Sequence, residues 1–335
     1  MAGKSGRTIN ATPQNVWRKR ILSWEGVLIV ILAVVLVLCR AMSATYTLEN
    51  VLREMPKYLA EMFLMLPMAF ILMMGEIDIS VGSIVCLSGT LGCFAVNAGM
   101  PFPVALLIML GTGLICGAIN GAIIVIFPEL PSMIVTLGTQ IIFRGIAEIM
   151  LGGGGSIAAK NADGFRAIGK SLGIVPIVFF LVIISGAIFV IISTKMKFGR
   201  ELMAIGSNRL TAFYSGVKVK KVLFISYVTM GAFSALCAIF FTAATYGANT
   251  TTGKGFEMDA IAMAVFGGIS STGGKGKMIG GILSAFVIVC LRIGLGQKNV
   301  NSLVILLIIG ILLIGAVLLP NISARISASK KKAIS

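Results

Sequence analysis

The chain has 335 residues, of which 57% are hydrophobic and only 12% charged, and its mean hydropathy is +1.02. Soluble globular proteins carry about 25% charged residues, so this composition excludes an ordinary soluble domain. The net charge of +16 does not indicate nucleic-acid binding, because the basic residues lie in short loops between apolar runs and not on one exposed domain.

The chain offers little for catalysis or metal binding. Its six cysteines all lie in apolar segments and are interpreted as small buried hydrophobic residues, not as a disulfide framework or a metal cluster. Histidine, the commonest proton shuttle and metal ligand, does not occur. No polar stretch reaches the size of a separate domain, which is about 50 residues or more. We therefore expect no enzyme activity, no catalytic residue, no metal and no cofactor.

Apolar runs predict an all-α polytopic membrane protein with about ten spans, since about 20 apolar residues cross a bilayer. The first run resembles a secretory signal peptide, with basic residues at 18–20 and small residues at 41–44. In a chain with many later spans, an uncleaved first helix is the preferred interpretation. The predicted spans are 26–42, 58–75, 80–97, 103–127, 132–151, 174–194, 222–246, 258–272, 277–295 and 302–319.

Basic residues favour one orientation of these spans. With both termini in the cytoplasm, the cytoplasmic segments carry roughly twice as many Lys and Arg as the outer ones, as the positive-inside rule requires. The predicted organisation is a cytoplasmic N-terminal segment 1–25, a transmembrane domain 26–319 with a long cytoplasmic loop 195–221, and a basic cytoplasmic tail 320–335.

The predicted spans form two halves, 26–151 and 174–319, of five helices each. An odd number of spans makes the second half start from the opposite side, which is the arrangement of an inverted repeat. At matching junctions each half carries an acidic pair near small residues, and glycine-interrupted segments at such positions indicate a transport pathway. The residues predicted to line the pathway or support its conformational change are Glu76, Asp78, Ser80, Ser83, Glu257, Asp259, Gly267 and Gly268.

Other roles are open for several charged residues in the spans. Glu76 and Asp78 could cap the third helix, a role compatible with lining the pathway. Arg144 and Glu148 lie four residues apart, so a mutually neutralising pair on one helix face is expected. Arg292 lies near a span end and is expected to extend to the membrane interface.

The long loop 195–221 contains a short predicted helix between Asn208 as the N-cap and Gly216 as the stop signal. Leu210, Phe213 and Tyr214 lie at positions i, i+3 and i+4 and form one apolar face. An apolar patch on a polar loop favours a docking site for a partner protein. Packing of this face against the protein's own helices is the alternative.

Residues Gly164–Ser171 match the phosphate-binding loop pattern. That pattern binds phosphate when it follows a buried strand and opens a helix. Here it follows a glycine-rich polar loop and leads into an apolar span, on the predicted outer side. The chain is therefore not expected to hydrolyse ATP itself.

Several longer motifs, in order, make the chain resemble one permease family from about Trp24 to Pro320. It is similar to the permeases of ribose-, galactose-, rhamnose- and autoinducer-2-type ABC importers. The motifs are Gly75–Ser83, Thr136–Thr139, Phe198–Asn208, Ser215–Gly216, Gly253–Ala262 and Gly267–Gly276.

The resemblance implies an inner-membrane permease that imports a monosaccharide or similar small polar solute. It implies a dimer of identical or related permeases, a cytoplasmic ABC ATPase and an extracytoplasmic solute-binding protein. The binding protein is expected to dock on residues 152–173 and 246–257. The loop helix takes the place of the family's coupling helix, although Gly206-Ser207-Asn208 stands where many members have Gly-Gly-Asn. The residues expected to couple to the ATPase are Gly206, Asn208, Leu210, Phe213, Tyr214 and Gly216.

Other classes remain as alternatives at this stage. The main one is a proton- or sodium-coupled secondary transporter with Glu76 or Asp78 as the ion site. A passive channel is disfavoured because no ring of pore-lining charges is evident. An intramembrane enzyme is disfavoured because no Ser–base or metal constellation occurs.

Overall fold

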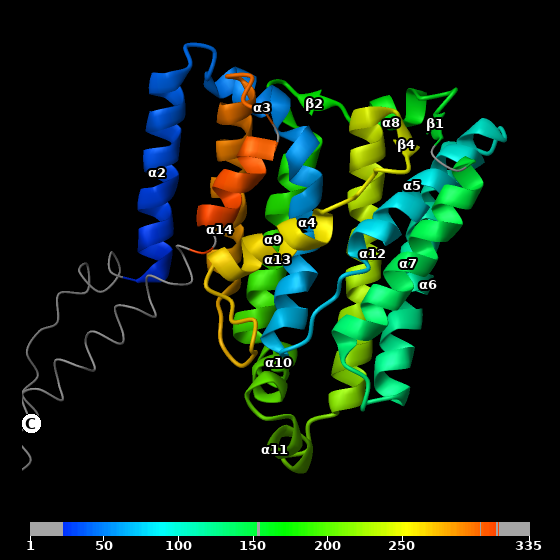
Figure 1. Cartoon of the computed structure of the whole chain (residues 1–335), viewed down its shortest axis with the longest axis vertical. Helices are drawn as coiled ribbons and strands as arrows, with labels where there is room; N and C mark the ends of the chain where they lie inside the picture. The colour runs from blue at the N-terminus through cyan, green and yellow to red at the C-terminus, as the bar shows by residue number, and fades with distance from the viewer. Residues whose placement is uncertain (1–22, 153–154, 302, 313, 315–335) are drawn as a thin grey trace, which may run out of the picture.

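The computed structural model describes residues 23–152, 155–301, 303–312 and 314 (Figure 1). Most of the predicted N-terminal segment 1–25 and the whole predicted tail 320–335 lie outside the described residues. The long helices run roughly along the long axis of the molecule, with short strands at one end (Figure 1).

Loops and turns connect the helices and a few short strands along the described chain. In order they are α2 (Trp24–Met42), α3 (Leu48–Glu54), α4 (Pro56–Met73), α5 (Val81–Asn97), α6 (Phe102–Ile126), α7 (Ser132–Leu151), β1 (Ser156–Ala158), α8 (Asp163–Ile168), β2 (Ser171–Leu172), β3 (Val175–Pro176), α9 (Ile177–Lys195), α10 (Lys197–Ser207), α11 (Arg209–Tyr214), α12 (Val219–Thr245), β4 (Gly247–Asn249), α13 (Phe256–Phe266), α14 (Met278–Gly296) and a last helix, Leu303–Leu312.

Proline stands at or directly before the start of several of these helices. Pro56 is the first residue of α4, and Pro131 and Pro176 directly precede α7 and α9. The fixed φ of proline suits the first helical turn, where its missing N–H would have no intrahelical acceptor. Gly152, with φ +76°, ends α7 in the left-handed conformation that glycine adopts without strain.

Within the described residues, seven helices are long and apolar enough to cross a membrane: α2, α4, α6, α7, α9, α12 and α14. The all-α polytopic class is therefore confirmed, whereas ten full-length spans are not. At 1.5 Å per residue, the 17 residues of α5 cover about 25 Å and the 11 of α13 about 16 Å, against about 30 Å of hydrocarbon.

The predicted span 258–272 is wrong in its second half. Helix α13 ends at Phe266, and residues 267–277 form a loop before α14. Gly268 and Gly273 adopt φ values of +87° and +82°, which an α-helix cannot contain. Hydropathy alone does not reveal that the helix ends at Phe266, because the residues from Gly267 to Ile269 are still apolar.

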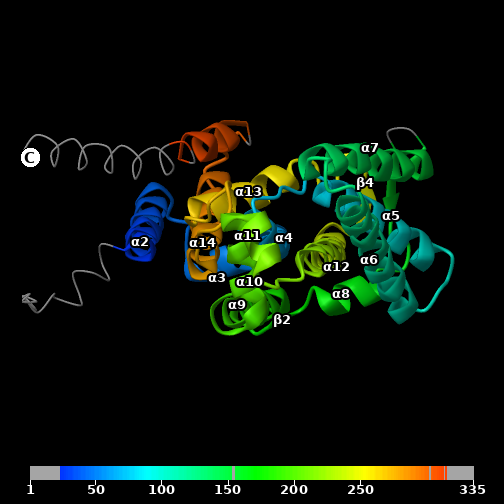
Figure 2. The same cartoon turned by 90° about the horizontal axis from the view of Figure 1, so that it is seen from below.

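The core is built around α4, which is buried along nearly its whole length. Helix α12 packs against both α4 and α6, and α2 lies at the edge beside α14 (Figure 2). Helices α2, α6, α7 and α9 expose apolar side chains outward, as expected of surfaces in contact with lipid.

Helices α6 and α12 approach each other through glycine. Gly113, Gly117 and Gly121 recur every four residues on α6. A Cβ atom at Gly113 would lie 2.2 Å from the carbonyl oxygen of Gly231, and one at Gly117 would lie 2.4 Å from that of Tyr227. Small residues at this spacing let membrane helices pack backbone to backbone.

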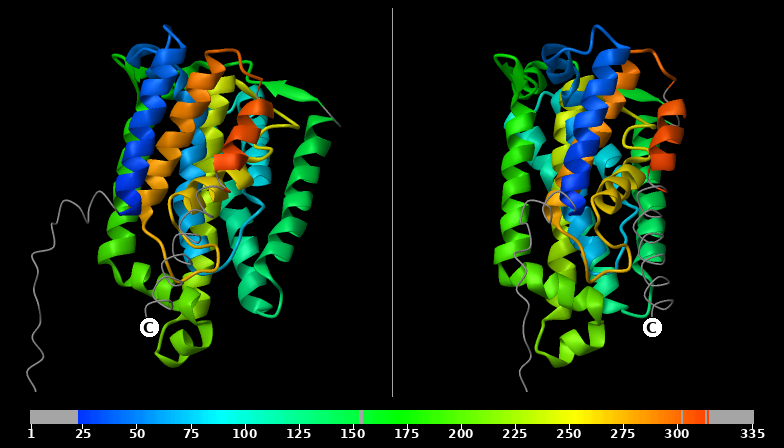
Figure 3. Two further views of the ribbon diagram at one scale, coloured as in Figure 1. Left: turned by 60° about the vertical axis from the view of Figure 1, so that its left-hand side comes forward. Right: turned by 90° about the vertical axis from the view of Figure 1, so that its left-hand side faces the viewer.

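The two ends of the molecule differ. The strand end contains α3, α8 and two small antiparallel sheets, β1 with β4 and β2 with β3. The α11 end, opposite to it, contains α10 and α11, and α11 projects beyond the bundle (Figures 1 and 3).

Candidate functional site

Two interruptions of the helical bundle lie next to each other. The chain is non-helical from residues 76 to 79 before α5, and from residues 250 to 255 it forms a non-helical turn before α13. A Cβ atom at Gly82 would lie 2.1 Å from the carbonyl oxygen of Gly253 and 2.5 Å from Oε2 of Glu257. The starts of α5 and α13 therefore touch, at the middle height of the molecule (Figure 1). Helices that begin at membrane depth in this way are typical of transport sites.

A buried hydrogen-bond network fixes the start of α5. Oδ1 of Asp78 accepts hydrogen bonds from the backbone N–H of Ser80 at 2.9 Å and from its hydroxyl at 2.7 Å. The Ser80 hydroxyl oxygen accepts from Nδ2 of Asn120 at 2.7 Å, and the Ser83 hydroxyl donates to the carbonyl of Ser80 at 2.6 Å. Asp78 thus holds the N-cap residue Ser80, but no side chain caps the N–H groups of the first turn of α5, so the capping interpretation is not confirmed.

Helix α7 supplies hydrogen-bond acceptors for the backbone N–H groups of the segment before α5. The N–H of Ile77 donates to the hydroxyl of Ser132 at 3.2 Å, and the N–H of Ile79 donates to that of Thr136 at 3.1 Å. Sequence reasoning did not assign Asn120 or Ser132 to the site. Their only signal is a polar side chain within or beside an apolar run, which names no partner.

The second acidic pair belongs to a different arrangement. Asp259 lies 2.5 Å from Nη2 of Arg292, and Glu61 of α4 lies 2.6 Å from Nη1 of the same guanidinium. The prediction that Arg292 extends to the membrane interface is wrong, because its side chain is 9% exposed and holds both carboxylates. Glu257 is also buried, next to Gly82.

Arg144 on α7 does not use Glu148 as its partner. Its Nη1 donates to the carbonyl oxygens of Thr250 and Thr252, at 3.1 and 2.7 Å. The predicted neutral pair is therefore wrong, and Arg144 instead holds the turn before α13. Beside it lies a groove of about 450 Å³ lined by Gln140, Ile141, Arg144, Gly145, Glu148, Thr250 and Lys254.

The glycine pair after α13 is tightly packed. A Cβ atom at Gly267 would lie 2.3 Å from the backbone nitrogen of Gly281 on α14, and one at Gly268 would lie 2.8 Å from the indole of Trp24. The indole N–H of Trp24 donates to the carbonyl of Phe266 at 2.9 Å. Gly267 and Gly268 thus allow α13 to end against α14 and α2.

The predicted loop helix is present as α11. Oδ1 of Asn208 accepts from the N–H of Thr211 at 2.8 Å, as an N-cap should, and Gly216 follows the helix with φ +82°. Leu210, Phe213 and Tyr214 are 65%, 62% and 79% exposed. These three side chains, here called the apolar triplet, do not pack back onto the protein's own helices. The triplet residues Leu210 and Phe213 border a hollow of about 880 Å³ that reaches Val125 and Pro128.

The phosphate-loop match does not have phosphate-loop geometry. Residues Asp163–Ile168 form α8, and the chain leaves that helix into β2 instead of entering a helix at Lys170. A Cβ atom at Gly164 would lie 2.2 Å from the ring of Phe102, so this glycine serves packing. The expectation that this motif is no nucleotide site agrees with its structure.

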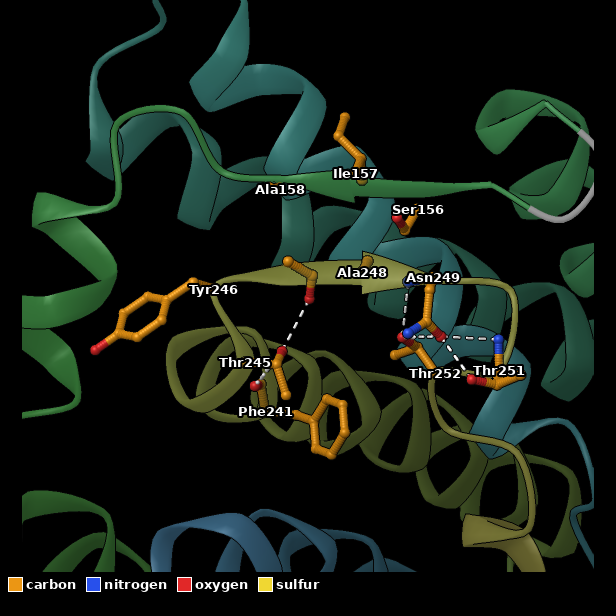
Figure 4. Close-up of a pocket in the computed structure, with 11 residues that line it drawn as sticks. Ser156, Ile157, Ala158, Phe241, Thr245, Tyr246, Ala248, Asn249, Thr251 and Thr252 are labelled. Carbon is orange, nitrogen blue, oxygen red and sulfur yellow. Dashed lines mark hydrogen bonds between the residues drawn. The ribbon is translucent and has the colours of Figure 1, made fainter.

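At the strand end, two loops far apart in the sequence join. Strands β1 and β4 pair antiparallel, with Ile157 opposite Ala248 (Figure 4). They border a hollow of about 290 Å³ with Tyr246 and Thr251 on its rim (Figure 4). The predicted docking segments 152–173 and 246–257 therefore meet where β1 pairs with β4, whereas Gly253 and Glu257 of the second segment are buried next to Gly82.

These features define a class of protein: a multi-pass membrane transport component, with two interrupted helices that meet at its centre and an exposed helix at one end. The chain belongs to the permease family described as "Branched-chain amino acid transport system / permease component", which matches residues 59–317.

Within this family, the chain is similar to permeases that are named for particular solutes. The D-allose transport system permease protein of Escherichia coli K12 is 32% identical over 88% of this chain and 91% of its own length. The ribose import permease protein of Bacillus subtilis 168 is 33% identical over 75% and 78%. An autoinducer 2 import system permease protein of Salmonella paratyphi B is 32% identical over 77% and 79%. No solved structure matches the chain. The resemblance to sugar and autoinducer-2 importer permeases is thus confirmed.

Proposed function

We propose that this chain is the membrane-spanning permease subunit of an ATP-driven importer for a monosaccharide or similar small polar solute. The observation that carries this proposal is the exposed apolar triplet on α11, at one end of a bundle with two interrupted helices. Relatives named for allose, ribose and autoinducer 2 support the substrate class. Membership of this family implies a separate ATPase and a solute-binding protein as partners.

The α11 end is proposed to face the cytoplasm, with both termini on that side. Support comes from the basic residues around α10 and α11, among them Lys195, Arg200, Lys220 and Lys221, since cytoplasmic segments are enriched in Lys and Arg. Two inverted five-helix halves, including the short helices α5 and α13, remain part of the proposal.

Transport is proposed to proceed without a tight site in the permease. The binding protein docks on the surface formed by β1 and β4 and selects the solute. ATP-driven closure of the ATPase pushes on the apolar triplet and shifts α5 and α13 around their contact at Gly82 and Gly253. A second permease subunit, identical or related, completes the path. Glu76, Asp78, Ser80, Ser83, Glu257, Asp259, Gly267 and Gly268 are proposed to support this movement.

Reconstitution in liposomes tests the proposal. The chain is assembled with a candidate ABC ATPase and a candidate solute-binding protein from the same organism, and uptake of radiolabelled D-ribose and D-allose is measured with ATP supplied to the ATPase side. We expect uptake that requires both partners and hydrolysable ATP. Gradient-driven uptake by the chain alone, with no effect of ATP, would instead identify an ion-coupled transporter.

A further inference from the structure

Three chain segments meet at the α11 end with no side chain between them. A Cβ atom at Gly206, in the last turn of α10, would lie 2.0 Å from the carbonyl oxygen of Met73 and 2.5 Å from the nitrogen of Gly274. The N–H of Gly274 in turn donates to that same Met73 carbonyl at 2.9 Å. The end of α10, the end of α4 and the loop after α13 are therefore in direct backbone contact, here called the glycine junction.

The glycine residues at the junction are required by its geometry. Gly75 and Gly273 adopt φ values of +77° and +82°, where other residues are strained. A Cβ atom at Gly273 would lie 2.8 Å from the nitrogen of Gly75 and 2.9 Å from Cα of Gly206. Since every neighbour is backbone, the contact cannot be relieved by a side-chain rotation. The three backbones can keep this contact only while these positions are glycine.

One ion pair connects α11 to the glycine junction. Nη1 of Arg209, the first residue of α11, lies 3.1 Å from Oε1 of Glu76. The Glu76 side chain is only 14% exposed and that of Arg209 is 40% exposed, so the pair is partly shielded from water. Glu76 directly follows Gly75 and begins the non-helical segment that leads into α5.

The junction is also close in sequence to both interrupted helices. From Glu76 the chain reaches Gly82, whose backbone contacts that of Gly253. From Gly273 the loop runs back to Phe266, the end of α13. Two short segments therefore connect the junction, and with it α11, to the entry of α5 and the exit of α13.

We infer that Arg209 and Glu76, together with the glycine junction, transmit movement of α11 to both interrupted helices. Arg209 and Glu76 are positioning residues that couple ATP hydrolysis to transport and do not contact solute. This inference rests on the proposed function, because it needs an ATPase that moves α11.

A charge exchange tests this inference in the reconstituted complex. The variants are Glu76→Arg, Arg209→Glu and the double variant with both changes, together with Arg209→Lys. Three quantities are measured: ATPase subunit retained on the purified permease, ATP hydrolysed, and labelled sugar taken up per ATP. A merely structural role would change retention or yield and would not change uptake per ATP alone.

We expect each single charge reversal to lower uptake per ATP by about fivefold or more, a typical size of coupling between distant sites. Retention of the ATPase should stay near the wild-type level, since the apolar triplet is intact. The double variant should recover at least about half of the wild-type ratio, and Arg209→Lys should retain most of it. The matched control is Glu201→Gln, which breaks the ion pair of Glu201 with Lys197 within α10 (3.5 Å) and should leave the ratio unchanged.

Wild-type uptake per ATP in both single variants would overturn the inference, as would failure of the double variant to recover any of the loss. If the charge reversals prevent assembly, Arg209→Gln decides the matter, because its partly exposed side chain can be neutralised without burying a new charge. An unchanged ratio in Arg209→Gln would contradict the inference. Absence of ATP-dependent uptake by the wild-type complex is a distinct result, which would remove the proposed function as well.

Discussion

Arg292 on α14 is a single side chain that links three helices, since it binds Glu61 of α4 and Asp259 of α13. A charged residue at membrane depth is costly unless it is paired inside the protein. Removing one partner of a buried ion pair leaves the other charge uncompensated and is strongly destabilising. The sequence places Arg292 near a span end, but Glu61 lies 231 residues away. Such a contact follows from helix packing and not from local pattern.

Arg292→Met is therefore expected to destabilise the protein by about 3–5 kcal/mol. The reason is that two buried carboxylates lose their common partner. The measurement is thermal unfolding of the purified chain in detergent. The control is Arg40→Met, because Arg40 lies at the exposed end of α2 and, among the described residues, donates only to the carbonyls of Ser43 and Ala44. Equal losses in the two variants would contradict the role of the buried pair.

A rescue makes this prediction more specific. Adding Glu61→Gln and Asp259→Asn to Arg292→Met removes the uncompensated carboxylates, so the midpoint of unfolding should rise again relative to Arg292→Met alone. No recovery would mean that Arg292 acts through packing of its side chain and not through charge.

At the scale of elements, the bundle depends on close approach of helix backbones. The recurrence of Gly113, Gly117 and Gly121 is visible in the sequence, but it does not say which helix lies against α6. That partner is α12, whose Gly231 faces Gly113. The same holds for the ends of α4 and α13. Glycine in the sequence marks where each helix stops, but it does not show that these ends share a junction with α10.

Gly113→Ala should lower stability by about 1–3 kcal/mol, the usual cost of overpacking a well-filled core. The added methyl group would lie 2.2 Å from the Gly231 carbonyl oxygen, so α6 and α12 must separate. Gly111→Ala is the matched control on the same helix, because among the described residues no atom beyond its own stretch of helix lies within 4 Å of its Cβ position. It should be neutral or stabilising by up to about 1 kcal/mol. Thermal unfolding of the two variants compares them directly, and equal midpoints would refute close packing at Gly113.

At the scale of the whole molecule, contacts at the two ends are connected through the interrupted helices. The strand end joins segments 156–158 and 247–249, and the latter leads by a short turn to α13. The α11 end presents the apolar triplet and contacts the chain before α5. The proposed import mechanism needs both ends, one for the solute-binding protein and one for the ATPase.

Leu210→Asp or Phe213→Asp should abolish retention of the ATPase on the purified permease and reduce ATP-dependent sugar uptake at least about tenfold, because a buried unpaired charge in an interface typically costs more than 1.4 kcal/mol. Insertion in the membrane should be unaffected, since both side chains are exposed. The control is Leu172→Asp, a similarly exposed leucine in β2 at the strand end, which should keep the ATPase bound. Wild-type uptake by the α11 variants would refute docking at the apolar triplet.

The sequence by itself determined the membrane class, the approximate bounds of most helices and the capped helix α11. These depend on hydropathy, proline, glycine and capping residues, whose effects are local to a few turns. Only the tertiary structure decided which groups pair. Arg292 binds Glu61 and Asp259, Arg144 binds the turn before α13, and Arg209 binds Glu76. Arg209 and Glu76 are separated by 133 residues in the sequence. They come together because α4, α10 and the loop after α13 pack backbone to backbone, which no local pattern in the sequence specifies.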